Sequence, residues 1–393
     1  MLSRRGVCLC LACILLVWSR GLYAQIIDFG PAEDYKVGWA PVDIVAGDFN
    51  GDGKLDLLTV SSPDLSRFPQ ISLLFGNGDG TFQQVRYAAT PKTAGPSAVV
   101  AGDFNGDGKL DVAIAAIDFM ASSHESVIWV LLGNGDGTFQ PAVSYPFQAV
   151  LTGLAAGYLN GDNKLDLVAV DRHDGNVFVL LGKGDGTFVR RPSFTAGAGA
   201  NSVAVGDFNL DGKADLALAN PKAKAMLVAL GNGDGSFQPL VSWTVPDVPL
   251  FSVIADLNKD GYPDIATGNW DNTVSVLLGT GNGAFQPAVT YSDIPTPSRP
   301  VVADFNGDGW LDLVVANNDS ANTITVLPGI GYGAFGAPLT FYINHSLWGM
   351  TPIEVVAVDL NGDGKPDVGV ADYDFAVGSN HHSYVSVFLN VTL

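Results

Sequence analysis

The sequence predicts an all-β protein, a seven-bladed β-propeller of four-stranded blades whose ring is closed by the N-terminal strand completing the last blade. One nine-residue phrase recurs seven times, and successive copies start 48, 49 or 55 residues apart. Short runs of small, apolar and β-branched residues flank each copy. Repeat periods of this size are typical of propellers and solenoids, and short apolar runs bounded by Gly, Asn and Asp indicate strands.

Residues 1–24 have the pattern of an export signal, and residues 25–393 are expected to form the propeller. Two arginines precede an apolar run over residues 7–18, and Ala24 offers a cleavage site. An uncleaved anchor is the alternative, but twelve apolar residues are too few to span a bilayer. All three cysteines lie in this segment, so the mature chain is expected to lack disulfides and thiolate sites. We therefore expect a secreted or extracellular protein, or a periplasmic one, without membrane insertion.

The repeated phrase defines seven units. Its copies are DFNGDGKLD (48–56), DFNGDGKLD (103–111), YLNGDNKLD (158–166), DFNLDGKAD (207–215), DLNKDGYPD (256–264), DFNGDGWLD (304–312) and DLNGDGKPD (359–367). One apolar run precedes each phrase, a second follows it, and a third comes after a loop of variable length. The third runs are 71–75, 127–132, 177–181, 226–230, 274–278, 324–327 and 385–389. In the first six units a glycine-rich turn, such as GNGDGTF at 76–82, then leads to a fourth, more polar strand. No stretch of the mature chain shows helical periodicity, so each unit is predicted to be one blade.

The two ends of the chain are complementary. The seventh unit stops at Leu393 soon after its third strand, while residues 25–38 have the pattern of a fourth strand without a blade of its own. We expect these residues to complete the seventh blade. An open solenoid would not need such a complement, so a closed ring is predicted.

The phrase has the donor pattern of a calcium-binding loop. Positions 1, 3, 5 and 9 carry Asp, Asn, Asp and Asp, and the glycine at position 6 permits a sharp turn. Oxygen donors favour calcium over zinc or copper, and magnesium is a weaker candidate because it needs a stricter octahedron. One such loop could be a plain turn, but three carboxylates within nine residues repel one another without a cation. The predicted side-chain ligands are Asp48, Asn50, Asp52, Asp56, Asp103, Asn105, Asp107, Asp111, Asn160, Asp162, Asp166, Asp207, Asn209, Asp211, Asp215, Asp256, Asn258, Asp260, Asp264, Asp304, Asn306, Asp308, Asp312, Asp359, Asn361, Asp363 and Asp367.

The third loop departs from this pattern. Tyr158 replaces its first Asp and Asn163 replaces its glycine. Since Asn tolerates the left-handed backbone conformation, we expect the turn to survive with a weak or empty site, which leaves about six calcium ions. The mature chain has 17 basic and 40 acidic side chains, a net charge of −23, and the loops hold 20 of these acids. Six ions would reduce that charge to about −11, and we expect them to be structural.

The phrase DFNGDGKLD with the downstream GNGDGTF resembles the FG-GAP or VCBS repeat of bacterial secreted proteins, and is similar to the calcium-binding blades of integrin α chains. The resemblance covers residues 25–393. It implies a seven-bladed propeller in which the calcium loop joins the first and second strands of a blade. It also implies that position 7 binds calcium through its carbonyl, here in Lys54, Lys109, Lys213, Tyr262, Trp310 and Lys365. It does not imply a particular ligand.

Because strands alternate in direction, the calcium loops and glycine-rich turns are expected to share one face, nearly uniform in sequence. The variable loops are expected to share the other face, where binding specificity usually resides. An alternative is that the aromatic and histidine side chains of these loops only pack the loops together. The candidate contacts there are Trp270, Tyr342, His345, Trp348, Tyr373, His381, His382 and His173, which lies beside Asp171 and Asp174.

The predicted function is a non-enzymatic adhesion or recognition module for a glycan or an extracellular protein, on the face opposite the calcium loops, in a monomeric chain. The alternative is a polysaccharide lyase or glycosidase with His173 or His381 as a general base. No serine-elbow, HExxH or phosphate-loop motif occurs, and no catalytic residue is assigned. A net charge of −20 for the whole chain argues against nucleic acid as a partner.

Overall fold

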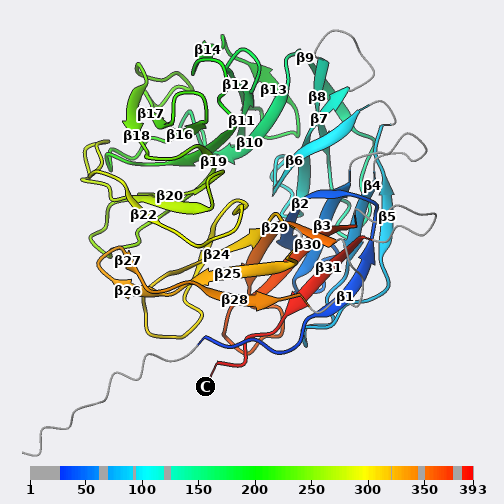
Figure 1. The fold of residues 1–393 in the computed structure, drawn as a ribbon. Coiled ribbons are helices and arrows are strands. Elements are labelled where there is room, and N and C mark those ends of the chain that lie inside the picture. Colours follow the sequence, from blue (N-terminus) through cyan, green and yellow to red (C-terminus); the bar gives the residue numbers. More distant parts are fainter. Residues whose placement is uncertain are drawn as a thin grey trace, which may run out of the picture.

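The computed structural model describes residues 27–61, 70–91, 94–118, 125–319, 321–343, 350–374 and 383–392. These residues form seven antiparallel sheets that stand as blades around a common axis (Figure 1). This part of the chain contains no α-helix, and so no helix that could cross a bilayer. The predicted all-β, seven-bladed fold is confirmed, while the predicted export signal lies outside the described residues.

Each blade begins with an inner strand and ends with an outer strand. Blades 1 to 3 contain β2 (Pro41–Gly47), β3 (Asp56–Ser61), β4 (Gln70–Leu74) and β5 (Arg86–Ala89); β6 (Gly95–Gly102), β7 (Asp111–Asp118), β8 (Glu125–Leu131) and β9 (Val143–Gln148); and β10 (Leu151–Gly157), β11 (Asp166–Asp171), β12 (Asn176–Gly182) and β13 (Phe188–Arg190), with β14 (Phe194–Thr195) also paired to β12. Blades 4 and 5 contain β15 (Ser202–Gly206), β16 (Asp215–Asn220), β17 (Ala225–Ala229) and β18 (Val241–Thr244); and β19 (Pro249–Ala255), β20 (Asp264–Asn269), β21 (Thr273–Leu277) and β22 (Val289–Tyr291).

Blades 6 and 7 each have an added feature. Blade 6 contains β23 (Val301–Ala303), β24 (Asp312–Asn317), β25 (Thr323–Leu327) and β28 (Leu339–Tyr342), and its glycine-rich turn forms a small hairpin of β26 (Gly329–Gly331) and β27 (Ala334–Phe335). Blade 7 contains β29 (Met350–Val358), β30 (Asp367–Asp374), β31 (Ser383–Phe388) and β1 (Glu33–Val37).

The N-terminal strand closes the ring, as the sequence predicts. β1 pairs with β31 in antiparallel register from Glu33 opposite Val387 to Val37 opposite Ser383, and the first described residues lie near the C-terminus in Figure 1. Phe29 extends this pairing through an isolated bridge to Asn390. The bonded ends tie the first residues of the propeller to the last.

The core lies between the blades rather than within one of them. The second strands are buried along their whole length in five of the blades, for example Asp166–Asp171 and Asp312–Asn317. Between blades 1 and 2, Leu58 and Ile71 pack with Val112 and Trp129 in one cluster. Burial on both faces explains why these strands are continuous apolar runs, and each large side chain contributes about 1.5–3 kcal/mol.

Three charged side chains occupy equivalent sequence positions in three blades, within or just before the innermost strand. Asp43, Arg299 and Glu354 each stand five residues before the nine-residue loop of their blade, in blades 1, 6 and 7. Arg299 Nη1 lies 3.8 Å from Asp43 Oδ1, and the side chain of Arg299 keeps 34% of its exposure. Glu354 is buried, and its Oε1 has no hydrogen-bond partner among the described residues. Two acids therefore share one base in a poorly hydrated site.

Glu354 is expected to make stability depend on pH. Its burial, reinforced by the charge of Asp43 and opposed by Arg299, raises its pKa from 4.5 to about 8. A raised pKa means that the folded state holds the proton more tightly, so this stability is complete below about pH 4.5 and is lost as the pH rises through 8. The slope is at most about 1.4 kcal/mol per pH unit.

Glu354→Gln supplies a neutral side chain of the same shape. We expect the variant to match wild type near pH 5 and to exceed its free energy of unfolding by about 1–3 kcal/mol near pH 8. Urea unfolding of both proteins at three pH values in constant calcium measures the difference. Parallel pH profiles would show that Glu354 is ionised in the folded protein at every pH tested.

Candidate functional site

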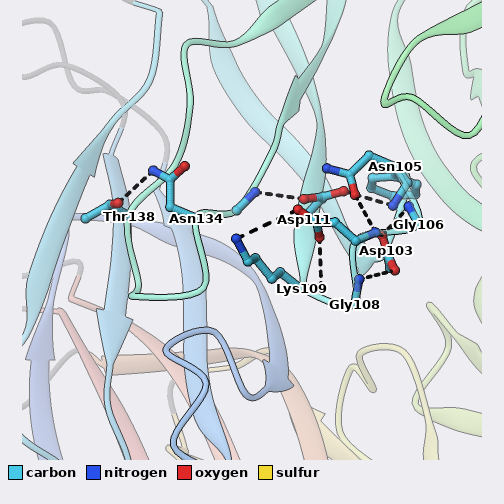
Figure 2. Close-up of polar contacts among 11 residues, drawn as sticks. Asp103, Asn105, Gly106, Gly108, Lys109, Asp111, Asn134 and Thr138 are labelled. Carbon is cyan, nitrogen blue, oxygen red and sulfur yellow. Dashed lines mark hydrogen bonds and ion pairs between the residues drawn. The ribbon is translucent and has the colours of Figure 1, made fainter.

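The nine-residue loops join the first and second strands of their blades and are closed by their own acidic side chains. Each loop takes the number of its blade. In loop 2 (residues 103–111), Asp103 Oδ2 accepts a hydrogen bond from Gly108 N at 2.8 Å, and Asn105 Oδ1 accepts one from Asp107 N at 2.9 Å (Figure 2). In the six loops that begin with Asp, position 1 is half-buried and position 5 is exposed. The side-chain oxygens of positions 1, 3 and 5 are thus gathered around one short turn.

Positions 4 and 6 of every loop require a left-handed backbone. Gly108 at position 6 has a φ of 79°, and Asn163 holds the same conformation in loop 3 with a φ of 59°. The expectation that Asn preserves the turn is confirmed. At position 4, Leu210 and Lys259 stand where five other loops have Gly, with φ values of 55° and 60°. These two residues carry backbone strain that glycine avoids.

The Asp at position 9 joins the loop to the glycine-rich turn of its own blade. Asp111 is fully buried, its Oδ2 accepts from Phe104 N at 2.9 Å, and its Oδ1 accepts from Gly133 N at 2.7 Å. The same two bonds recur in the other blades, with Asn390 N replacing the glycine in blade 7. The acceptors are Asp56, Asp166, Asp215, Asp264, Asp312 and Asp367. Sequence reasoning assigned these residues to metal alone and missed this role.

Burial also changes the proton affinity of the position-9 carboxyls. It raises the pKa of Asp312 to about 7 and those of Asp56 and Asp264 to about 6. The backbone hydrogen bonds lower these pKa values, and repulsion from the other loop acids raises them. A carboxyl must lose its proton before it binds a metal. Calcium and protons would therefore compete for these groups.

The glycine-rich turns of blades 1 to 5 also rest on the loop of the preceding blade. Gly137 N in blade 2 donates to Phe49 O in loop 1 at 2.9 Å. The equivalent bonds, 3.0–3.2 Å long, are Gly80 N to Leu360 O, Gly186 N to Phe104 O, Gly235 N to Leu159 O and Gly283 N to Phe208 O. In blade 7 the side-chain Nδ2 of Asn390 donates to Phe305 O at 2.8 Å. Loops and turns share one face, as predicted, and they join neighbouring blades.

The donor chemistry of the intact loops fits calcium. Each offers three carboxylates and one amide oxygen without nitrogen or sulfur donors, and Asp304 Oδ1 is buried with no hydrogen-bond partner in the described residues. In that same part of the chain no three carboxylate, thiol or imidazole groups converge as a metal centre, and the loop acids accept hydrogen bonds from backbone N–H groups instead. In loop 3, Tyr158 is 57% exposed and supplies no carboxylate.

The described candidates of the variable face are only partly available for binding. Trp270 is 62% exposed and Tyr342 73% exposed, whereas Tyr373 packs edge-on against Trp39 with ring centroids 5.3 Å apart. His173 Nδ1 lies 2.8 Å from Asp174 Oδ1 at the surface. Four further candidates lie outside the described residues, namely His345, Trp348, His381 and His382.

Solved structures with the same fold are distant in sequence. BBS1N, in the crystal structure of its complex with ARL6DN, has a TM-score of 0.60 and 13% identity over 93% of this chain and 97% of that chain. Raptor of Chaetomium thermophilum has a TM-score of 0.60 and 11% identity over 95% of this chain and 30% of that chain. No curated protein matches the sequence. These likenesses show the propeller fold alone.

A family model assigns the repeats. The model for the FG-GAP-like repeat matches residues 48–114, 158–218, 207–265, 256–315 and 304–370. The matches begin at the nine-residue loops and run through the buried second strands, so they cover the acidic positions that close each loop. The chain belongs to the FG-GAP-like repeat family.

Proposed function

We propose that the chain is a secreted, calcium-binding propeller that acts as a non-enzymatic recognition module for a protein or a glycan. The difference between its two faces carries the proposal. One face repeats a loop and a turn that hold the blades together, while the connections of the other face differ from blade to blade. A rigid scaffold with variable loops is a common arrangement for binding. The BBS1N structure, a propeller in a complex with ARL6DN, supports a protein as the partner.

Calcium is proposed for the loops on the chemistry of their oxygens. Six loops combine three carboxylates, one amide and left-handed turns at positions 4 and 6. Sites of this kind in extracellular modules bind calcium with dissociation constants of roughly 0.1–1 mM. Bound ions would offset the repulsion among the loop acids, so the metal is proposed to be structural.

Restoring the consensus in loop 3 tests this assignment. In Tyr158→Asp with Asn163→Gly, the new carboxylate can accept from the loop N–H groups as Asp103 does in loop 2. We expect about one additional bound calcium and a larger rise of the melting temperature with calcium than in wild type. Isothermal titration calorimetry gives the number of sites, and Tyr158→Asn with Asn163→Gly is the control without a carboxylate. An unchanged number of sites would contradict the ligand assignment.

The variable face of blade 5 offers a surface for recognition. Exposed Trp270 directly precedes the lining of an open polar cavity of about 450 Å³. The cavity is lined by Asp271, Asn272, Thr273, Ser292, Asp293, Ile294 and Pro295. An exposed aromatic residue next in sequence to a cavity lined by hydroxyl, amide and carboxylate groups suits a sugar or a polar protein segment.

A glycan array with wild type, Trp270→Ala in blade 5 and Tyr342→Ala in blade 6 tests the variable face, and Tyr87→Ala on outer strand β5 is the control for loss of an exposed aromatic ring. Binding that both test variants weaken and the control keeps, without release of reducing ends or unsaturated sugars, supports recognition. Release of such products would instead favour a polysaccharide-degrading enzyme. Equal binding by all four proteins would show that this face is not used.

A further inference from the structure

The face that carries the loops differs in blade 6. The glycine-rich turn reads GNGDGTF in blades 1 and 2, GKGDGTF in blade 3, GNGDGSF in blade 4 and GTGNGAF in blade 5, but GIGYGAF in blade 6. Ile330 and Tyr332 thus replace a polar residue and an aspartate or asparagine. Position 7 of the adjoining loop is Trp310, where four other loops among the six intact ones have Lys. The expectation of a nearly uniform face therefore fails at this blade.

These replacements form one surface cluster, the blade-6 patch of Trp310, Ile330 and Tyr332. The Trp310 and Tyr332 rings lie 5.6 Å apart with an interplanar angle of 42°. Ile330 is 63% exposed and Tyr332 82% exposed. Lys259 of loop 5 places its Nζ 4.7 Å from the centre of the Trp310 ring. The patch thus presents apolar groups to solvent at the junction of blades 5 and 6.

The fold does not require this exposed patch. In blade 2, Asp136 Oδ1 accepts from Thr138 N at 2.9 Å and from its hydroxyl at 2.6 Å, which fixes the turn. Blade 6 has Ala334 in place of that Thr, and Tyr332 holds a left-handed backbone with a φ of 56°. An aromatic residue in this conformation is strained, and its ring remains largely in water. Such a combination points to a role outside the folded monomer.

The surroundings favour a basic partner. Loops 5 and 6 flank the patch and together carry six carboxylates and one lysine, Lys259, so their combined net charge is −5 without metal and about −1 with one calcium bound in each. Lys259 above Trp310 shows that this ring already attracts a cation. Tyr332 and Ile330 supply the large contact area typical of residues that dominate protein interfaces.

Resting on the proposed recognition function, we propose that the blade-6 patch is a docking surface for an arginine-bearing segment of a protein partner. The guanidinium plane stacks on the exposed ring of Tyr332, the aliphatic stem of the arginine covers Ile330, and the acids of loops 5 and 6 attract its charge. This surface lies on the face opposite to the cavity of blade 5, so the two can be tested separately.

The double variant Ile330→Asn with Tyr332→Asp separates contact from charge. It restores the polar residues that the other turns carry, and it makes the protein one charge more negative. Binding by charge alone would therefore become tighter, whereas binding through the patch becomes weaker. Val143→Asp on outer strand β9 is the control, since it also removes an exposed apolar side chain and adds one negative charge.

The probe is an octa-arginine peptide, measured by isothermal titration calorimetry in calcium at about 150 mM salt. We expect the double variant to bind about tenfold more weakly than wild type, and Val143→Asp to bind as wild type does. Equal or tighter binding by the double variant, or no binding by wild type, would overturn the proposal. The proposal would also be overturned if wild type bound xylohexaose and the double variant did not, because the patch would then be a glycan-binding site.

Two further measurements keep the outcome interpretable. Tyr332→Asn removes the ring without a charge and in a residue type that accepts the left-handed conformation, so it tests the patch even if the double variant folds poorly. All variants are expected to bind the same number of calcium ions and to keep any ligand of the blade-5 cavity. If a variant loses peptide binding but keeps its calcium sites and its binding at the blade-5 cavity, the loss is due to the patch. If wild type itself shows neither calcium binding nor binding at that cavity, the proposed function fails.

Discussion

Replacing Asp166 by Ala is expected to lower the free energy of unfolding by about 2–4 kcal/mol, with or without calcium. The carboxylate is fully buried and accepts from Leu159 N and Gly182 N, both at 2.8 Å. Its removal leaves both N–H groups buried without an acceptor, at about 1–3 kcal/mol each. Burial raises the pKa of Asp166, which shows that burying this carboxylate is itself unfavourable. The substitution removes that cost, and this offsets part of the loss.

Loop 3 makes the interpretation direct, because Tyr158 already deprives it of the first carboxylate. Urea unfolding in calcium and in chelator measures the loss. Asp185→Ala is the control, since Asp185 is an exposed turn residue that accepts from Thr187 N at 2.9 Å. A loss for Asp166→Ala no larger than for this control would refute the bridging role. Asp111→Ala in loop 2 is expected to lower the free energy of unfolding by the same amount in chelator, and by a larger amount in calcium because a metal ligand is also removed.

Withdrawing calcium is expected to produce the largest change in the molecule. At about 1 mM calcium each site contributes roughly 0.4–1.4 kcal/mol, so six sites contribute on the order of 2–8 kcal/mol. That range is comparable with the stability of a whole domain. The melting temperature is expected to fall by on the order of 10 °C.

Scanning calorimetry in calcium, in magnesium and in chelator at matched ionic strength tests this expectation. Any salt screens the repulsion of a chain with a net charge of −20, so only a difference between the two cations reports specific sites. We expect calcium to raise the melting temperature well above the value in magnesium. Equal values in the two cations would reduce the loops to acidic turns.

The architecture was predictable because the apolar runs within each repeat predict the strands of one blade. The third apolar run of the third unit, residues 177–181, became β12 (Asn176–Gly182). The closing strand was predictable for the same reason, since only residues before the first repeat could complete the last blade. Seven copies let a weak local pattern be recognised where a single copy would have been ambiguous.

The contacts between repeats were not predictable in this way. For example, Gly133 N donates to Asp111 Oδ1. This contact depends on the lengths and pairing of the strands between the two residues, and the repeat spacing alone does not give them. Asp43 and Glu354 stand out as acids in apolar runs, but only the ring brings them near Arg299. The blade-6 patch was visible in the sequence, because GIGYGAF departs from the other turns, and it was missed by averaging over the repeats.

The central claim, that the nine-residue loops are structural calcium sites, is tested most directly by counting the ions. Equilibrium dialysis of the mature chain against increasing calcium, at constant ionic strength, gives the number bound at saturation. The account predicts about six per chain, with loop 3 weak or empty. Binding of no calcium in the range of a few millimolar would contradict it and would leave the loops as turns held by their own backbone hydrogen bonds.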